Sequence, residues 1–177
     1  MIKRIISIMA AAVLAALCMA VSSPALAEES GDYEKYAFLS ALDIISVAED
    51  NADEKVSRAR LAFIAAKAFC INSENGTNFM NYRDVDENTP YAGAIDAISG
   101  IRAAGGCDGY FYPNRTALTG EAVKIIITAM GYDFKAERLG GYPYGYFAAV
   151  PEISKGVNMS AEDELTLGVL AKMLYNV

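Results

Sequence analysis

The sequence has no histidine, no tryptophan and only three cysteines among its 177 residues. Without histidine, the Ser-His-Asp and Cys-His arrangements of nucleophilic catalysis are excluded. A zinc site is not expected either, because histidine and Cys-x-x-Cys pairs are both missing. A carboxylate pair is the remaining catalytic device, but surface acids on an acidic domain are usually solvated. We therefore expect a non-catalytic protein that uses neither a metal nor a cofactor.

The few cysteines leave two interpretations open. Cys18 lies in the apolar N-terminal stretch, whereas Cys70 and Cys107 lie in the remainder of the chain. An even number of cysteines in a secreted protein permits one disulfide. Alternatively, the two residues pack separately as small apolar side chains.

The chain also lacks a long basic run, and its 22 acidic residues outnumber 15 basic ones, for a net charge of −7. Nucleic acid is not an expected partner, because neutralising phosphates requires clustered lysine and arginine. After residue 27 there is no apolar run of the ~20 residues that a transmembrane helix needs.

The N-terminus has the pattern of a secretory signal peptide. MIKR is basic, IISIMAAAVLAALCMAV is apolar, and SSPALA ends in a small-x-small site. The pattern predicts a signal peptide over 1–27, cleaved between Ala27 and Glu28, and a polar leader over 28–32. An uncleaved membrane anchor is the alternative. A lipoprotein site at Cys18 is disfavoured, because bulky Leu17 precedes it. We expect a secreted protein.

Helical periodicity appears six times after the leader, in three helix–loop–helix pairs. Ser57, Thr119 and Thr166 each precede the second helix of a pair as predicted N-caps, and Gly131 is a predicted C-terminal stop. One pair cannot bury its apolar stripe, but three pairs can share a core. The sequence thus predicts an all-α fold of three helical hairpins, with segments at 33–46, 55–69, 90–105, 117–132, 144–156 and 164–177.

The middle pair resembles one repeat of the S-layer homology (SLH) family. The resemblance rests on an aromatic-x-Asp-Val start, an Asp-Gly-x-Phe-x-Pro turn and a Leu-Thr-x-x-Glu helix start. The matching residues are Tyr82, Asp84, Val85, Ala94, Ile95, Asp108, Gly109, Phe111, Pro113, Leu118, Thr119, Glu121, Gly131 and Tyr132. The flanking pairs are similar mainly by position. The implied repeats are 33–75 (degenerate), 79–133 and 140–177 (degenerate), which together form one domain over 33–177.

This resemblance implies a pseudo-threefold helical bundle with grooves between the repeats. SLH domains bind secondary cell-wall polysaccharide, often ketal-pyruvylated, and so anchor their proteins to the Gram-positive cell wall. The expected partner is therefore this peptidoglycan-linked glycan at the cell surface, with self-assembly as a further expectation.

Two departures from the family pattern concern the ligand. The family places an arginine at the start of each second helix, and the first repeat keeps it as Arg58. When the second repeat is matched to the family pattern, Gly120 stands in the place of this arginine, and the third repeat also lacks the arginine. The tryptophan usual before the first helix is replaced by Tyr91.

The resemblance implies a carbohydrate site made of Arg58, Ser57, Asp84 and Tyr91. An arginine in the first turn of a helix can grip a carboxylate through two hydrogen bonds, beside free backbone N–H groups. The alternative for Arg58 is a solvated cation, and the alternative for Asp84 is a cap or turn acid of the helix that follows it.

Three further features allow a structural explanation. Asp108-Gly109 is typical of a tight turn. The acidic run that starts at Asp84 suggests half a calcium loop but lacks the required glycine and glutamate. Tyr142, Tyr144 and Tyr146 could stack on sugars or pack into the core. A competing hypothesis for the whole chain is a degenerate module that assembles with proteins and binds no glycan.

Overall fold

The computed structural model describes residues 34–46, 51–72 and 82–177. The chain divides into two compact units, Met1–Lys35 and Tyr36–Val177, and the second contains all of the elements α3 to α8 described below. The predicted signal peptide and leader lie outside the described residues. The described part of the chain contains helices and isolated β-bridges but no strand, as expected for an all-α fold.

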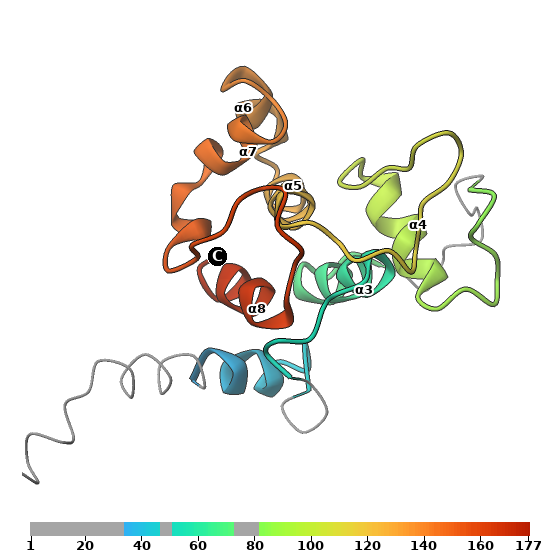
Figure 1. Ribbon diagram of the computed structural model, residues 1–177, viewed down its shortest axis with the longest axis horizontal. Helices are drawn as coiled ribbons and strands as arrows, with labels where there is room; N and C mark the ends of the chain where they lie inside the picture. Colours follow the sequence, from blue (N-terminus) through green and yellow to red (C-terminus); the bar gives the residue numbers. More distant parts are fainter. Residues whose placement is uncertain (1–33, 47–50, 73–81) are drawn as a thin grey trace, which may run out of the picture. The chain divides into compact units, whose positions relative to one another are not determined.

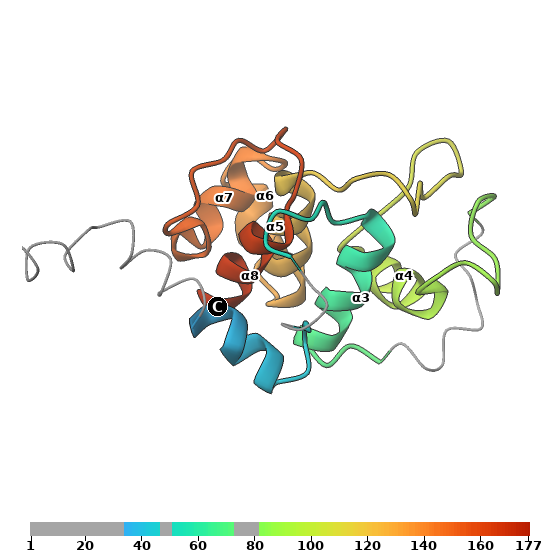
Figure 2. The ribbon, with the colours of Figure 1, turned by 60° about the horizontal axis from the view of Figure 1, so that its bottom comes forward.

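Among the described residues, helices lie at all six predicted segments in the predicted order, together with one additional helix, α6. Residues 34–41 are helical. The elements after them are α3 (Arg58–Ala68), α4 (Ala92–Gly100), α5 (Thr119–Ala129), α6 (Asp133–Arg138), α7 (Tyr144–Ala149), the 3-10 helix η1 (Pro151–Ser154) and α8 (Leu167–Tyr175). Figures 1 and 2 show α3 between α4 and α5, with α8 and α7 also packed on α5.

Several helix ends lie where local chemistry predicts them. The Ser57 hydroxyl accepts a hydrogen bond from the Arg60 N–H at 3.2 Å, and the Thr166 hydroxyl accepts one from Val169 at 3.4 Å. Gly131 adopts a positive φ of 80° after α5. Its N–H donates to the Thr128 carbonyl, and the next N–H donates to the Ile127 carbonyl, which together form a Schellman ending. These caps and the stop at Gly131 are confirmed.

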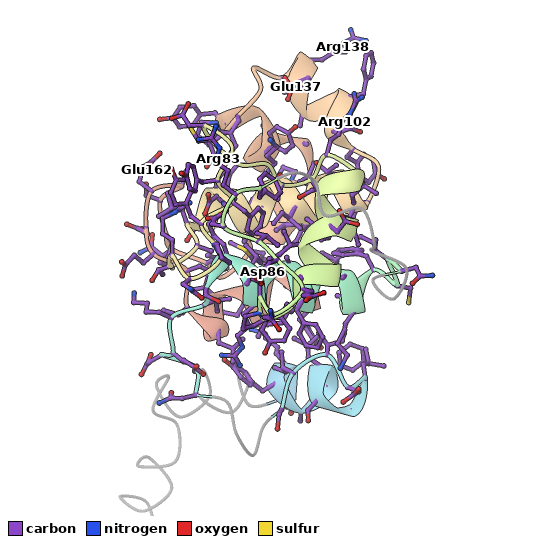
Figure 3. All side chains as sticks on the ribbon, turned by 90° about the vertical axis from the view of Figure 1, so that its right-hand side faces the viewer. Arg83, Asp86, Arg102, Glu137, Arg138 and Glu162 are labelled. Carbon is purple, nitrogen blue, oxygen red and sulfur yellow. The ribbon has the colours of Figure 1, made fainter. Side chains whose placement is uncertain are left out.

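Helix α6 was not predicted, because its sequence DFKAER carries little apolar periodicity. Only Ala136 of this helix is buried, while Phe134 is 71% exposed. The guanidinium of Arg138 lies 5.9 Å from the centre of the Phe134 ring, and Figure 3 shows Arg138 at the outer surface. This short helix is an added surface element between the second and third helix pairs.

A cycle of backbone hydrogen bonds joins the three segments that lead into α3, α5 and α8. The Val56 N–H donates to Leu165, the Leu165 N–H donates to Ala117, and the Ala117 N–H donates back to Val56, at 2.8–3.0 Å. All three residues are fully buried. Two further cycles link the same three segments in the opposite direction, and in these the donor and acceptor residues differ. Their donors are Arg58, Thr119 and Leu167 on acceptors Arg115, Asp163 and Glu54, and Ala59, Gly120 and Gly168 on acceptors Pro113, Ala161 and Ala52.

These cycles correct the sequence alignment by one residue in the second helix pair. Thr119, and not Gly120, occupies the place of Arg58, and Leu167 occupies it in the third pair. The predicted Thr119 N-cap is wrong. Thr119 is fully buried inside α5, and its hydroxyl donates to the Asp163 carbonyl at 3.1 Å. Leu118 is the cap residue, and its N–H is satisfied by the Glu121 carboxylate at 2.8 Å.

Candidate functional site

Arg58 lies at the start of α3 with its side chain only 8% exposed. Its Nε donates to the Phe111 carbonyl and its Nη2 to the Gly105 carbonyl, each at 2.8 Å. Its Nη1 is hydrogen-bonded to the Glu121 carboxylate. A guanidinium has five N–H donors, so three of them already have partners inside the protein. The alternative of a solvated cation is therefore wrong.

Glu121 of α5 is shared between two arginines. Its Oε1 accepts from Arg58 and, at 2.5 Å, from Arg115, while its Oε2 accepts from the Leu118 N–H. Burial lowers the pKa of Arg58, and the nearby carboxylate of Glu121 opposes this shift. The Phe111 ring, 4.5 Å from the guanidinium carbon, covers one face of Arg58. One acid thus fixes two cations at this place.

Asp84 stabilises the loop that contacts Arg58. Its carboxylate accepts hydrogen bonds from the Phe111 N–H at 2.8 Å and from the Tyr112 N–H at 2.7 Å. These bonds link residues 27 and 28 positions apart, so Asp84 is not the local cap of α4 that the alternative described. Phe111 links Asp84 to Arg58, because its N–H donates to the Asp84 carboxylate and its carbonyl accepts from the Arg58 Nε.

A cavity of about 180 Å³ lies on one side of the Arg58–Glu121 pair. Its walls are Arg58, Ala103, Ala104, Gly105, Glu121, Lys124 and Tyr142. A second cavity of about 270 Å³ also borders this pair and shares Arg58, Gly105 and Glu121 with the first. Arg115 and Tyr112 are among its additional walls. Three cations, Arg58, Lys124 and Arg115, and one glutamate, Glu121, therefore line the two cavities, although the chain as a whole is acidic.

Tyr142 lines the smaller cavity, and Gly120 makes room for its side chain. A Cβ at Gly120 would lie 2.9 Å from the Tyr142 hydroxyl and 3.1 Å from the Ala161 carbonyl oxygen. Partial burial, with smaller contributions from Glu121 and Glu162, raises the pKa of Tyr142. The Lys124 ammonium lies 6.0 Å from the centre of the Tyr142 ring. An aromatic face and a cation are thus adjacent in one cavity.

Tyr91, the fourth predicted site residue, lies elsewhere. It is the left-handed N-cap of α4 and stacks on Phe63 with ring centres 4.5 Å apart. It borders a different cavity of about 190 Å³, which is also lined by Arg60 and Lys67 of α3. The structure therefore brings Arg58, Ser57 and Asp84 into one neighbourhood and separates Tyr91 from it.

The structure decides three further alternatives, which concern the two cysteines, the Asp108-Gly109 turn and the three tyrosines. Cys70 and Cys107 are free and exposed, so the structure has no disulfide between them, and the alternative that they pack as small apolar side chains is also wrong. Asp108 and Gly109 both have positive φ and form a two-residue turn, closed by paired hydrogen bonds between Cys107 and Tyr110. Among the three alternating tyrosines, Tyr146 is buried, whereas Tyr142 and Tyr144 are 46% and 81% exposed.

Glu121 and Lys124 are the site residues that sequence reasoning missed, whereas Tyr142 was considered for sugar stacking but was not singled out from Tyr144 and Tyr146. Glu121 entered the sequence analysis only as part of the Leu-Thr-x-x-Glu helix start. Lys124 lies three residues later on α5, and this helical spacing was the available signal that both side chains share a face. Nothing in the sequence alone places Tyr142 over Gly120, because the two residues belong to different helix pairs.

Comparison of the chain with models of known protein families and with curated proteins finds no match. No described helix is long and apolar enough to cross a membrane. In the described ranges, no group of three or more histidine, cysteine, aspartate or glutamate residues is arranged to bind a metal ion.

Proposed function

We propose that this protein is a non-catalytic module that binds an acidic cell-wall polysaccharide and so attaches to the Gram-positive cell surface. The three linked segments would be three degenerate SLH repeats in a pseudo-threefold bundle. The observation that carries the proposal is the cavity beside the Arg58–Glu121 pair. It combines excess positive charge with the ring of Tyr142, and an acidic sugar requires both a cation and an apolar ring face.

The cyclic hydrogen bonds support the repeat part of the proposal. Each of the three segments donates to and accepts from the other two at equivalent positions, as repeats around an axis would. The retained Arg58 supports the ligand part, because Arg58 and Lys124 line the cavity together and outweigh the single negative charge of Glu121.

Binding of the mature protein to purified Gram-positive walls tests this function. Retention on intact walls, and its loss after chemical removal of the polymers that are not peptidoglycan, is the expected result. Equal retention on both preparations would show that the polymer is not the ligand. Free polymer added as a competitor should release the bound protein.

A second candidate function is assembly with other proteins without glycan binding. It is favoured by the exposed apolar side chains between α5 and α7, above all Phe134 and Tyr144. Sedimentation of the protein at rising concentration tests self-association. If a mass increase disappears in Phe134→Ser while wall retention is absent in both proteins, the assembly function replaces the first proposal.

A further inference from the structure

The cation best placed to contact a ligand in the smaller cavity is not Arg58. Three donors of Arg58 are bound to Phe111, Gly105 and Glu121, and its side chain is almost fully buried. A ligand carboxylate at Nη1 would have to displace Glu121, which also binds Arg115 and the Leu118 N–H. Arg58 is therefore suited to position Glu121 and the loop carrying Gly105.

Lys124 differs from Arg58 in being uncommitted. It lines the cavity, and within the described ranges its ammonium takes part in no hydrogen bond or ion pair. Its recorded partner is the Tyr142 ring, at 6.0 Å from the ring centre. A lysine is a compact point charge with three donors, which suits a ligand anion that approaches from solvent.

Tyr142 supplies the second part of the contact. Its side chain borders the cavity from the start of the third helix pair, while Lys124 belongs to the second pair. A ligand held by both would bridge two helix pairs. Tyrosine offers a rigid apolar face with a hydroxyl at its edge, and a sugar ring presents a matching apolar face and hydroxyls.

We propose that Lys124 binds the carboxylate of an acidic sugar whose ring lies against Tyr142, and that Arg58 acts as a positioning residue behind them. This inference rests on the proposed function, because it specifies which groups take the carboxylate at that same site. Lys124 forms a charge-assisted hydrogen bond to the ligand, and Arg58 keeps the loop and Glu121 in place through its three internal bonds.

The experiment compares two proteins with two ligands. Affinity for purified wall polysaccharide is measured by titration calorimetry, alongside the same polymer with its carboxylates reduced to alcohols. The wild type should bind the native polymer about tenfold more tightly than the reduced one, a preference of about 1.4 kcal/mol. Lys124→Met keeps the length of the side chain but removes its charge, so this preference should disappear.

Lys172→Met is the matched control, because Lys172 lies at the equivalent position of α8 and does not line this cavity. It should retain the wild-type preference. Tyr142→Ala should weaken binding of both polymers by a similar factor and leave the preference unchanged. The melting temperature of each variant confirms that it is folded.

The outcomes separate the two proposals. If the wild type binds neither polymer, the proposed function fails, and the role of Lys124 fails with it. If the wild type prefers the native polymer and Lys124→Met keeps that preference, only the inference about Lys124 is overturned. An equal loss of preference in Lys172→Met would also overturn it, because the effect would then be one of general charge.

Discussion

At the scale of single residues, Arg58 could either stabilise the fold or bind a ligand, and the sequence alone did not distinguish these two roles. It is buried by the loop around Gly105 and Phe111, and its charge is neutralised by Glu121. Removing one partner of a buried ion pair leaves the other charge uncompensated and the bound carbonyls unsatisfied. Arg58 therefore contributes to stability whether or not a ligand is present.

Arg58→Ala is expected to lower the free energy of unfolding by about 3–5 kcal/mol. Two carbonyls lose their donor, and Glu121 keeps only Arg115 as a cationic partner. Urea denaturation followed by circular dichroism measures the change. An unaltered midpoint would mean that the internal bonds of Arg58 do not stabilise the fold. Loss of wall binding in this variant would not by itself identify a ligand contact.

The buried Tyr146 gives a pH-dependent prediction. Burial, reinforced by its hydrogen bond to Glu137 at 2.9 Å, raises its pKa from 10.0 to about 12. Below pH 10 both the folded and unfolded states keep the phenolic proton. Between pH 10 and pH 12 the unfolded state loses it first, so stability falls as the pH rises through this window.

Over that range the wild type is expected to lose about 2–3 kcal/mol more stability than Tyr146→Phe. The other tyrosines titrate in both proteins, so the difference between the two isolates Tyr146. Urea denaturation at pH 9, 10, 11 and 12 provides the measurement. Parallel stability curves for the two proteins would contradict the raised pKa.

At the scale of elements, the start of α5 shows how one missing side chain makes room for another. Gly120, Gly168 and Ala59 occupy equivalent positions, so the backbone at this position accepts a Cβ in at least one of the three helices. Only at Gly120 does an added Cβ meet the Tyr142 hydroxyl, at 2.9 Å. The absence of a side chain at Gly120 therefore allows Tyr142 to take its place beside the cavity.

Gly120→Ala is expected to displace Tyr142 and to weaken polysaccharide binding several-fold. Its effect on stability should be small, because the gain in helix propensity of about 1 kcal/mol offsets the crowding. Gly168→Ala is the control, since its new Cβ would meet only Ala52 among the nearest neighbours. Calorimetric titration of both variants measures the difference. Equal affinities would show that Tyr142 does not need the space above Gly120.

The sequence predicted the helices and their local ends better than the contacts between helix pairs. The caps at Ser57 and Thr166 and the glycine stop after α5 depend on neighbouring residues, so they could be read directly. The cap at Thr119 was wrong, because tertiary hydrogen bonding to Asp163 draws this residue into the helix. The Arg58–Glu121 pair and the contact of Gly120 with Tyr142 join residues far apart in sequence, for which a single sequence carries no signal.

At the scale of the whole described unit, stability depends on all three helix pairs together. Each buried donor at the centre, such as the Val56 N–H, is satisfied by another pair and not by its own. An orphaned buried N–H costs about 1–3 kcal/mol. A single pair would leave these groups unsatisfied and would also expose its apolar stripe.

Deleting residues 140–177 is therefore expected to abolish cooperative unfolding, whereas a chain that begins at Glu28 should unfold in one transition. The deletion removes the Leu165 carbonyl that accepts from Val56 and the N–H that donates to Ala117. Urea titration followed by circular dichroism and tyrosine fluorescence distinguishes the two cases. A truncated chain with the midpoint of the longer one would show that two pairs form an independent fold.

The central hydrogen-bond cycle also limits the number of helix pairs that it can join to three. Its contacts are head-to-tail and return to their starting point after three members, so the arrangement is a closed ring and not an open stack. A fourth helix pair would find each of these central donors and acceptors already occupied. A longer chain built on this plan would therefore grow by adding a complete new ring of three, and not by inserting one more pair.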